Sequence, residues 1–154
     1  MADPNTLSSI GISFYHTAIA AANEVGNVMD VSGPNFARDV IDATSHSSPD
    51  DFKESIVGRW DGGEMTFDIE WDPQNTNHQF LVNQVTTSPA ADDPKTYFLR
   101  FPSAPAKASF GSIEFKAHLV GFAPLGPVEG KLAASITLKV TGKPTITAVD
   151  ATVP

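Results

Sequence analysis

Alternating apolar and polar residues in the last third of the chain predict long β-strands. From Leu132 to Val140 apolar residues occupy every second position, and small or polar residues occupy the positions between them. A period of two gives a strand one buried and one polar face, and it is incompatible with a helix. Two further strand-like runs, at 97–101 and 109–122, come before this one. The last run ends in Thr-Gly-Lys-Pro-Thr, in which Gly142 and Pro144 predict a turn that stops the strand.

The same alternation follows the pair Gly62-Gly63 in the middle of the chain. One face of this predicted strand carries Met65, Phe67, Ile69 and Trp71, and the other carries Glu64, Thr66, Asp68, Glu70 and Asp72. Acids two positions apart on one strand face lie about 7 Å from each other, so water must screen their repulsion. Long two-faced strands of this kind suit a protein that builds sheet with its neighbours.

One short helix is expected next to this strand. Asp72-Pro73 suits a helix N-cap followed by the first helical position. Phe80, Leu81 and Val85 fall close to one helical face, which places the helix near 74–86. With extended segments at 10–17, 27–35 and 37–47, the order of elements predicts an all-β fold: an antiparallel β-sandwich or barrel with one short flanking α-helix.

No linker or internal repeat divides the chain, so its 154 residues predict a single domain. The expected limits are a flexible arm at 1–9, a domain at 10–150 with a mobile loop at 46–58, and a tail at 151–154. The N-terminus resembles no signal peptide, and no apolar run is long enough to cross a bilayer, so we expect no membrane insertion. The absence of cysteine excludes disulfides, thiol catalysis and thiolate metal sites.

Charge is unevenly distributed within the net charge of −8. Residues 1–90 contain thirteen acids and three bases, whereas residues 91–154 contain five acids and seven bases. This balance is opposite to that of a protein that grips nucleic acid by its phosphates. It is compatible with simple solubility, with a surface that must not adhere to nucleic acid, or with two oppositely charged faces that dock head to tail.

The sequence contains no recognisable catalytic motif. It lacks a nucleophile elbow, a zinc-protease helix, a phosphate-binding loop and a dinucleotide fingerprint. The four histidines, His16, His46, His78 and His118, have no ligand spacing and are expected at the surface or core edge. We therefore expect no enzyme, cofactor or metal. Trp71 is expected in the core, whereas Trp60 either anchors a subunit contact or holds the Gly62-Gly63 turn.

Four segments in this order resemble the major tail tube proteins of long-tailed bacteriophages. They are the strand end Val-Ile-Asp-Ala-Thr-Ser at 40–45, the glycine turn and alternating strand at 62–73, the Phe-Pro-ended strand at 97–102, and the closing strand at 130–145. No single motif is specific, and the ordered combination, which spans nearly the whole chain from about residue 10, carries the resemblance.

The resemblance implies subunits that form six-fold rings with one continuous inner barrel, stacked into a tube through which genomic DNA leaves the capsid. Barrel closure would remove exposed strand edges. The expected lumen-facing acids are Glu64, Asp68, Glu70 and Asp72, with Lys131, Ser135, Thr137 and Lys139 as weaker candidates. The expected ring-to-ring contact is the 46–58 loop, in particular Ser48, Asp50, Asp51, Phe52, Lys53 and Glu54.

The partners implied are further copies of the chain, the tail-tip initiator, the tape-measure and terminator proteins, and double-stranded DNA that passes without adhering. The expected location is the virion tail, after assembly in the host cytoplasm. Alternatives are another virion β-subunit, such as a capsid decoration protein, tail terminator, or contractile-tail or secretion-system tube. A stand-alone immunoglobulin-like or carbohydrate-binding module would instead need clustered exposed aromatics, for which Tyr15, Phe52 and Trp60 are the candidates.

Overall fold

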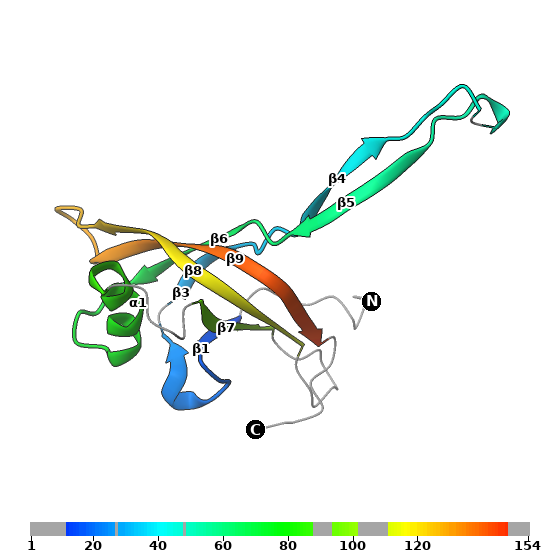
Figure 1. The fold of residues 1–154 in the computed structure, drawn as a ribbon. Helices are drawn as coiled ribbons and strands as arrows, with labels where there is room; N and C mark the ends of the chain where they lie inside the picture. Colours follow the sequence, from blue (N-terminus) through cyan, green and yellow to red (C-terminus); the bar gives the residue numbers. More distant parts are fainter. Residues whose placement is uncertain (1–11, 27, 48, 88–93, 102–110, 148–154) are drawn as a thin grey trace, which may run out of the picture.

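The computed structural model describes residues 12–26, 28–47, 49–87, 94–101 and 111–147. Within these residues the chain forms one seven-stranded antiparallel sheet, a separate two-stranded hairpin and one α-helix (Figure 1). The sheet order is β2-β1-β7-β8-β9-β6-β3, and the hairpin pairs β4 with β5. The elements are β1 (Ser13–His16), β2 (Glu24–Val25), β3 (Val28–Ser32), β4 (Ala37–Asp42), β5 (Ser55–Asp61), β6 (Glu64–Glu70), α1 (Thr76–Thr86), β7 (Lys95–Arg100), β8 (Ser112–Leu125) and β9 (Ala133–Thr147), with short 3-10 turns at Ala21–Asn23 and Pro49–Asp51.

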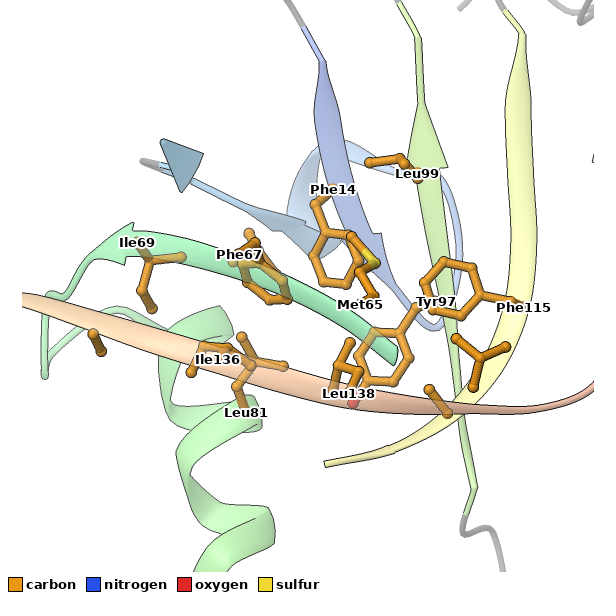
Figure 2. Close-up of a cluster of buried hydrophobic side chains, with 14 residues drawn as sticks. Phe14, Met65, Phe67, Ile69, Leu81, Tyr97, Leu99, Phe115, Ile136 and Leu138 are labelled. Carbon is orange, nitrogen blue, oxygen red and sulfur yellow. The ribbon is translucent and has the colours of Figure 1, made fainter. Parts of the chain in front are cut away.

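The sheet curls on itself and encloses the core. Strands β1 and β6 are separated by three other strands in the sheet, yet the rings of Phe14 and Phe67 lie 4.6 Å apart. Such contact is possible only when the sheet bends through a large angle, as Figure 2 shows. Leu81 of α1 closes this interior and is fully buried. The predicted antiparallel all-β fold with one flanking helix is confirmed, and the curled single sheet is closer to the barrel than to the sandwich.

Side chains from six strands fill the interior and explain the predicted periodicity. The buried residues of β6 and β9 are those that the alternation assigned to the apolar face: Met65, Phe67, Ile69, Ala134, Ile136, Leu138 and Val140. Trp71, which was expected in the core, is partly buried at its edge, where its ring meets Phe122 edge-on at 5.3 Å. Burial of these large apolar side chains provides most of the driving force for this fold.

Helix α1 occupies nearly the predicted range but begins differently. Its N-cap is Asn75, whose side-chain oxygen accepts hydrogen bonds from the backbone N–H groups of Asn77 and His78. The prediction that Asp72 caps the helix is wrong. Asp72 instead accepts from the N–H of Gln74 and so shapes the turn that leads into the helix.

His78 departs from the expectation of a surface or core-edge residue, because it is fully buried. Its Nδ1 accepts from the N–H of Asp72 at 3.0 Å, and its Nε2 donates to the carbonyl oxygen of Gly26 at 2.8 Å. Both ring nitrogens are used to satisfy backbone groups, which a buried polar side chain requires. His78 thereby ties α1 to the β2–β3 connection.

Strand β9 does not stop at the Thr-Gly-Lys-Pro-Thr sequence, so the predicted strand end is wrong. The strand continues to Thr147, and its pairing with β8 shifts register between Glu114 and Lys116. Gly142 lies within this irregularity and adopts a left-handed φ of 76°. A β-bulge absorbs the extra residues and bends the strand instead of ending it.

The hairpin of β4 and β5 projects away from the sheet (Figure 1). The mobile loop predicted at 46–58 is too long, because Ser55 to Gly58 already belong to β5. Hydrogen bonds join the two arms just before the tip: the N–H of Ala43 and the hydroxyl of Thr44 donate to the carbonyl of Glu54, and the N–H of Glu54 donates to Thr44 Oγ1. The loop therefore spans the residues between Thr44 and Glu54.

Candidate assembly surfaces

The face of the sheet opposite the core carries the polar residues that the alternation predicted. On this face Glu64 pairs with Lys139, Thr66 with Thr137, and Asp68 with Ser135 across β6 and β9. Glu70 ends the row opposite Ala133. The predicted polar face is therefore present for Glu64, Asp68 and Glu70. Asp72 lies beyond the end of β6 in the turn before α1, so its predicted place on this strand face is wrong.

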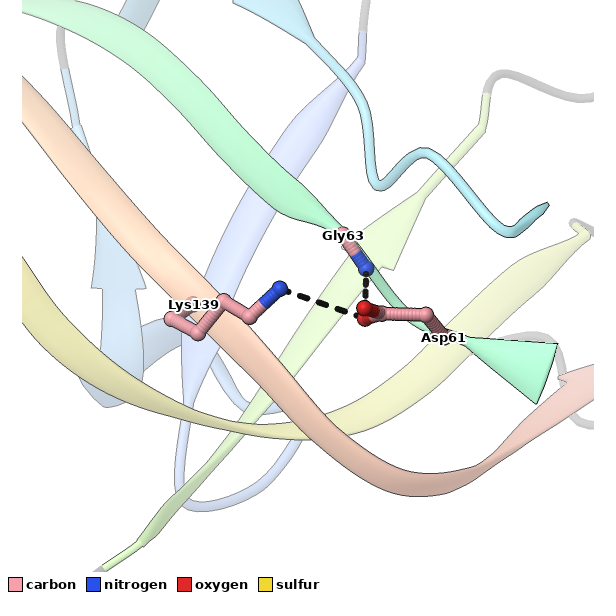
Figure 3. A network of polar contacts seen from close by, with 3 residues as sticks. All are labelled: Asp61, Gly63 and Lys139. Carbon is pink, nitrogen blue, oxygen red and sulfur yellow. Dashed lines mark hydrogen bonds and ion pairs between the residues drawn. The ribbon is translucent and has the colours of Figure 1, made fainter. Parts of the chain in front are cut away.

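Two lysines reduce the negative charge of this surface. Lys131 Nζ lies 2.8 Å from a carboxylate oxygen of Glu70, and Lys139 Nζ lies 3.2 Å from Asp61 (Figure 3). The hydrogen bond to Glu70, followed by its charge, raises the pKa of Lys131. The polar face is thus mixed in charge, with Glu64 and Asp68 as its central acids.

The hairpin exposes apolar side chains on both of its faces. Val40 pairs with Val57, and the next pair, Ile41 with Ile56, points to the opposite face. All four side chains are at least half exposed. A two-stranded hairpin is marginally stable by itself, and one that exposes apolar residues on both sides needs partners on both sides. This pattern makes the hairpin a candidate assembly surface.

The tip of the hairpin carries the residues that were expected to contact a neighbouring ring. Asp50, Asp51, Phe52, Lys53 and Glu54 are all exposed, and Phe52 has 75% of its surface exposed. Ser48 lies outside the described residues. The structure places this set at the end of an arm that extends away from the domain, which is the position a docking element needs.

Trp60 lies at the base of the hairpin, with 64% of its surface exposed. The guanidinium group of Arg38, its cross-strand partner, lies 4.6 Å from the centre of its ring. The Gly62-Gly63 turn is held by Asp61, whose carboxylate accepts from the N–H of Gly63 at 2.8 Å. The exposure of Trp60 favours its interpretation as a contact residue, which stays a prediction.

An apolar cleft of about 480 Å³ opens where the hairpin leaves the sheet. Its lining comes from three separate parts of the chain and consists of Phe36, Trp60, Gly62, Gly142, Lys143, Pro144 and Ile146. Gly62 allows the hairpin base to approach β9, because a Cβ atom there would collide with the side chain of Val140. Sequence reasoning missed this cleft, and no local pattern signals it.

A second apolar tip was also missed. The turn between β8 and β9 exposes Leu125, Val128 and Leu132, and Val128 is fully exposed. The Gly126-Pro127 pair was the available signal for a turn at this place. The molecule therefore has two apolar tips, one on each hairpin.

The sequence model described as the lambda phage tail tube protein, TTP, matches residues 11–147, which is most of the chain. The chain belongs to the lambda phage tail tube protein family. The resemblance stated from the sequence is thus confirmed, and the role of this tail tube protein is structural, as a component of the virion tail. No match was found among curated proteins.

Solved structures share the fold at low sequence identity. A chain of the sheath–tube complex of an extracellular contractile injection system (PVC) has a TM-score of 0.71 at 12% identity, covering 94% of this chain and 93% of that one. A chain of the anti-feeding prophage tube-terminating cap has a TM-score of 0.71 at 11% identity, covering 96% and 95%. A chain of the C6-symmetric tail of a GTA particle has a TM-score of 0.59 at 11% identity, covering 89% and 94%.

Other kinds of site find little support in the described part of the chain. No group of three or more His, Asp or Glu side chains there could hold a metal ion. None of the helices there is both long and apolar enough to cross a membrane. Of the three candidate aromatics for a binding module, Tyr15 is buried and only Phe52 and Trp60 are exposed, at opposite ends of β5.

Proposed function

We propose that this tail tube protein assembles into stacked, six-membered rings whose joined sheets form the conduit for the phage genome. The observation that carries this proposal is the projecting hairpin, whose apolar side chains on both faces find no cover in their own domain. The free energy gained by burying them is available only on assembly with other molecules. The hairpin then lies between neighbouring copies and supplies the ring-to-ring contact.

Ring formation is supported by the edges of the curled sheet. Strands β2 and β3 end the sheet on its two sides, so each presents backbone groups that a neighbour can pair. Addition of sheets edge to edge around a symmetry axis closes a barrel and leaves no free edge. In this arrangement the core and α1 lie outside the barrel wall, and the polar face lines the bore.

The polar face suits contact with DNA that must keep moving. Its acids, Glu64 and Asp68, oppose the approach of phosphates, while Lys139 and Lys131 are engaged by Asp61 and Glu70. Lysines paired in this way offer less free positive charge to a passing duplex. We propose a bore that is weakly repulsive to DNA.

The remaining partners follow from the same role. The tail tube protein would meet a tail-tip initiator at one end, a terminator at the other, and the tape-measure protein inside, after assembly in the host cytoplasm. We propose no enzymatic activity for it.

A tube inside a contractile sheath is the second candidate, favoured by the likeness to chains of contractile injection systems. Binding of a sheath protein to assembled tubes would distinguish it from a tube without a sheath.

The proposal is tested by negative-stain electron microscopy and sedimentation of the purified protein across a concentration series, with and without added tail-tip complexes. We compare the wild type with Ile56→Asp on the hairpin and Val85→Asp on α1, two substitutions of similarly exposed apolar residues. We expect tubes from the wild type and Val85→Asp, and their loss in Ile56→Asp. Equal assembly of all three would remove the hairpin from the interface. A wild type that remains monomeric even with tail-tip complexes would overturn the tube proposal.

A further inference from the structure

The apolar cleft at the hairpin base lies between β5 and β9, where the two strands diverge. The hairpin leaves in one direction, while the last part of β9 bends away in the other (Figure 1). Its apolar side chains are Phe36 and Trp60, from the region of the hairpin base, and Pro144 and Ile146, from the last part of β9. An apolar cleft of about 480 Å³ is large enough to accept a side chain as big as an aromatic ring with its flanking residues.

The rim of this cleft is basic. Lys143 is exposed and belongs to its lining, and the guanidinium group of Arg38 lies over the exposed ring of Trp60. A ligand that fits must therefore combine an apolar group, which fills the cleft, with negative charge, which meets the rim.

The tip of the hairpin has this combination. Phe52 is exposed over 75% of its surface, and it follows directly on Asp50 and Asp51, which are also exposed. The other tip has the apolar residue Val128 with a single acid, Glu129, and a lysine at 131. Charge complementarity therefore favours the tip that contains Phe52.

A copy of the protein does not fill its own cleft with its own tip. Trp60 follows Phe52 by eight positions, and residues 55–60 of this stretch lie in the extended strand β5. At about 3.3 Å per residue this corresponds to about 26 Å. The hairpin also projects away from the sheet (Figure 1). Only another molecule can bring Phe52 into the cleft.

We propose that the hairpin tip of one copy docks in the cleft of the next copy, with Phe52 between Trp60 and Pro144 and the two aspartates against Lys143 and Arg38. The inference rests on the proposed tube function and names the acceptor surface within it. Tip and cleft are different surfaces of one chain, so the contact is heterologous and propagates from copy to copy. Successive clefts are then separated by the reach of the hairpin, about 26 Å of backbone plus a side chain at each end.

Engineered disulfides test the docking directly, because the natural chain contains no cysteine. The variant Asp51→Cys/Lys143→Cys keeps Phe52 and places one thiol on the tip and one on the rim. The matched control Glu129→Cys/Lys143→Cys keeps the same rim thiol and also replaces one acid, but it places the tip thiol on the β8–β9 turn. After assembly and mild oxidation, we expect a ladder of covalent dimers, trimers and longer chains from the first variant on a non-reducing gel, and monomer from the control.

The outcomes separate the docking inference from the proposed function. A ladder from the control instead of the first variant would assign the cleft to the β8–β9 tip. Tubes without a ladder in the first variant would overturn the docking and leave the tube function standing. If neither the wild type nor the variants form rings or tubes, even with tail-tip complexes, the docking and the tube function both fail.

A charge swap provides a second measurement that leaves Phe52 unchanged. Lys143→Glu places a like charge against the aspartates, and we expect it to raise the concentration needed for assembly at least about tenfold. Adding Asp51→Lys to the same chain restores opposite charges and should recover most of that loss. Glu129→Lys, a charge reversal of the same size at the other tip, should leave assembly within about twofold of the wild type. Failure of the double substitution to recover assembly, with Lys143→Glu impaired, would contradict the pairing.

Discussion

Lys139 on β9 donates a hydrogen bond across 3.2 Å to Asp61, the last residue of β5, and so connects the domain to the base of the projecting hairpin. The same carboxylate accepts from the N–H of Gly63 (Figure 3). One exposed acid thus joins the end of β5 to the turn before β6 and to β9, at the point where the chain changes direction.

The pKa of Asp61 should show whether its carboxylate interacts more strongly with the backbone of Gly63 or with Lys139. Its pKa lies below the ordinary value first because of the hydrogen bond from the backbone of Gly63, and then because of the hydrogen bond and charge of Lys139. We therefore expect Lys139→Met to raise the pKa of Asp61 only part of the way to its ordinary value. NMR titration of the carboxyl carbon in both proteins measures this. A return to the full ordinary value would assign the effect to Lys139 alone.

The sign of the linked change in stability follows from the lowered pKa. Because the folded form prefers ionised Asp61, this contribution is complete above the unfolded pKa, near 4, and is lost as the pH falls through the lower folded value. The hairpin base should loosen only below about pH 4, in the same range. Hydrogen exchange of the Gly63 amide should rise there relative to that of buried β9 amides.

Gly63 is a second position at which we expect a substitution to destabilise the fold. It has a left-handed φ of 64°, and a Cβ atom there would collide with the carbonyl oxygen of Asn35. Gly63→Ala should lower the free energy of unfolding by about 1–3 kcal/mol, since a strained backbone and a steric conflict act together. Gly126→Ala is the control, because a Cβ atom there meets nothing within 4 Å, and it should change stability by less than about 0.5 kcal/mol. Chemical denaturation measures both, and equal effects would contradict the steric argument.

His78 should contribute to stability and not to assembly. His78→Ala leaves the N–H of Asp72 and the carbonyl of Gly26 without their partner, and it also removes buried volume. Each orphaned buried group costs about 1–3 kcal/mol, so we expect a total loss of roughly 2–5 kcal/mol. His46→Ala, at an exposed position of the hairpin loop, should be nearly neutral for folding. Similar unfolding midpoints for the two variants would show that His78 is replaceable.

The elements that could be predicted from the sequence are those with a local cause. The alternation in β6 and β9 follows from a neighbour within the same domain, as does the burial of Leu81 in α1. Val85, which was assigned to the same helical face, is exposed. The hairpin had no comparable signal, because Val40-Ile41 and Ile56-Val57 place apolar residues on both faces and no layer of the domain covers either. The cleft could not be predicted, because bending at Gly142 brings Pro144 and Ile146 near Trp60.

The last prediction concerns the charge of the bore. If the polar face lines the tube, replacing its central acids with lysine should make the bore bind DNA. Glu64→Lys/Asp68→Lys makes the charge of every subunit more positive by four, all of it on the polar face, so that face becomes strongly basic in a ring of several copies. We expect assembled tubes of this variant to retain linear duplex DNA in co-sedimentation at low salt and to release it as salt rises, because the binding depends on counterion release.

Val85→Lys is a suitable control, because it adds an exposed lysine on α1, which lies outside the proposed barrel wall. Tubes of this control should retain DNA much less than tubes of the double variant. Equal retention by both would mean that added charge anywhere on the tube captures DNA from outside. If instead the double variant retains no more DNA than the wild type, although its tubes are intact, the face formed by β6 and β9 does not line the conduit. The bore would then have to be assigned to another surface of the sheet.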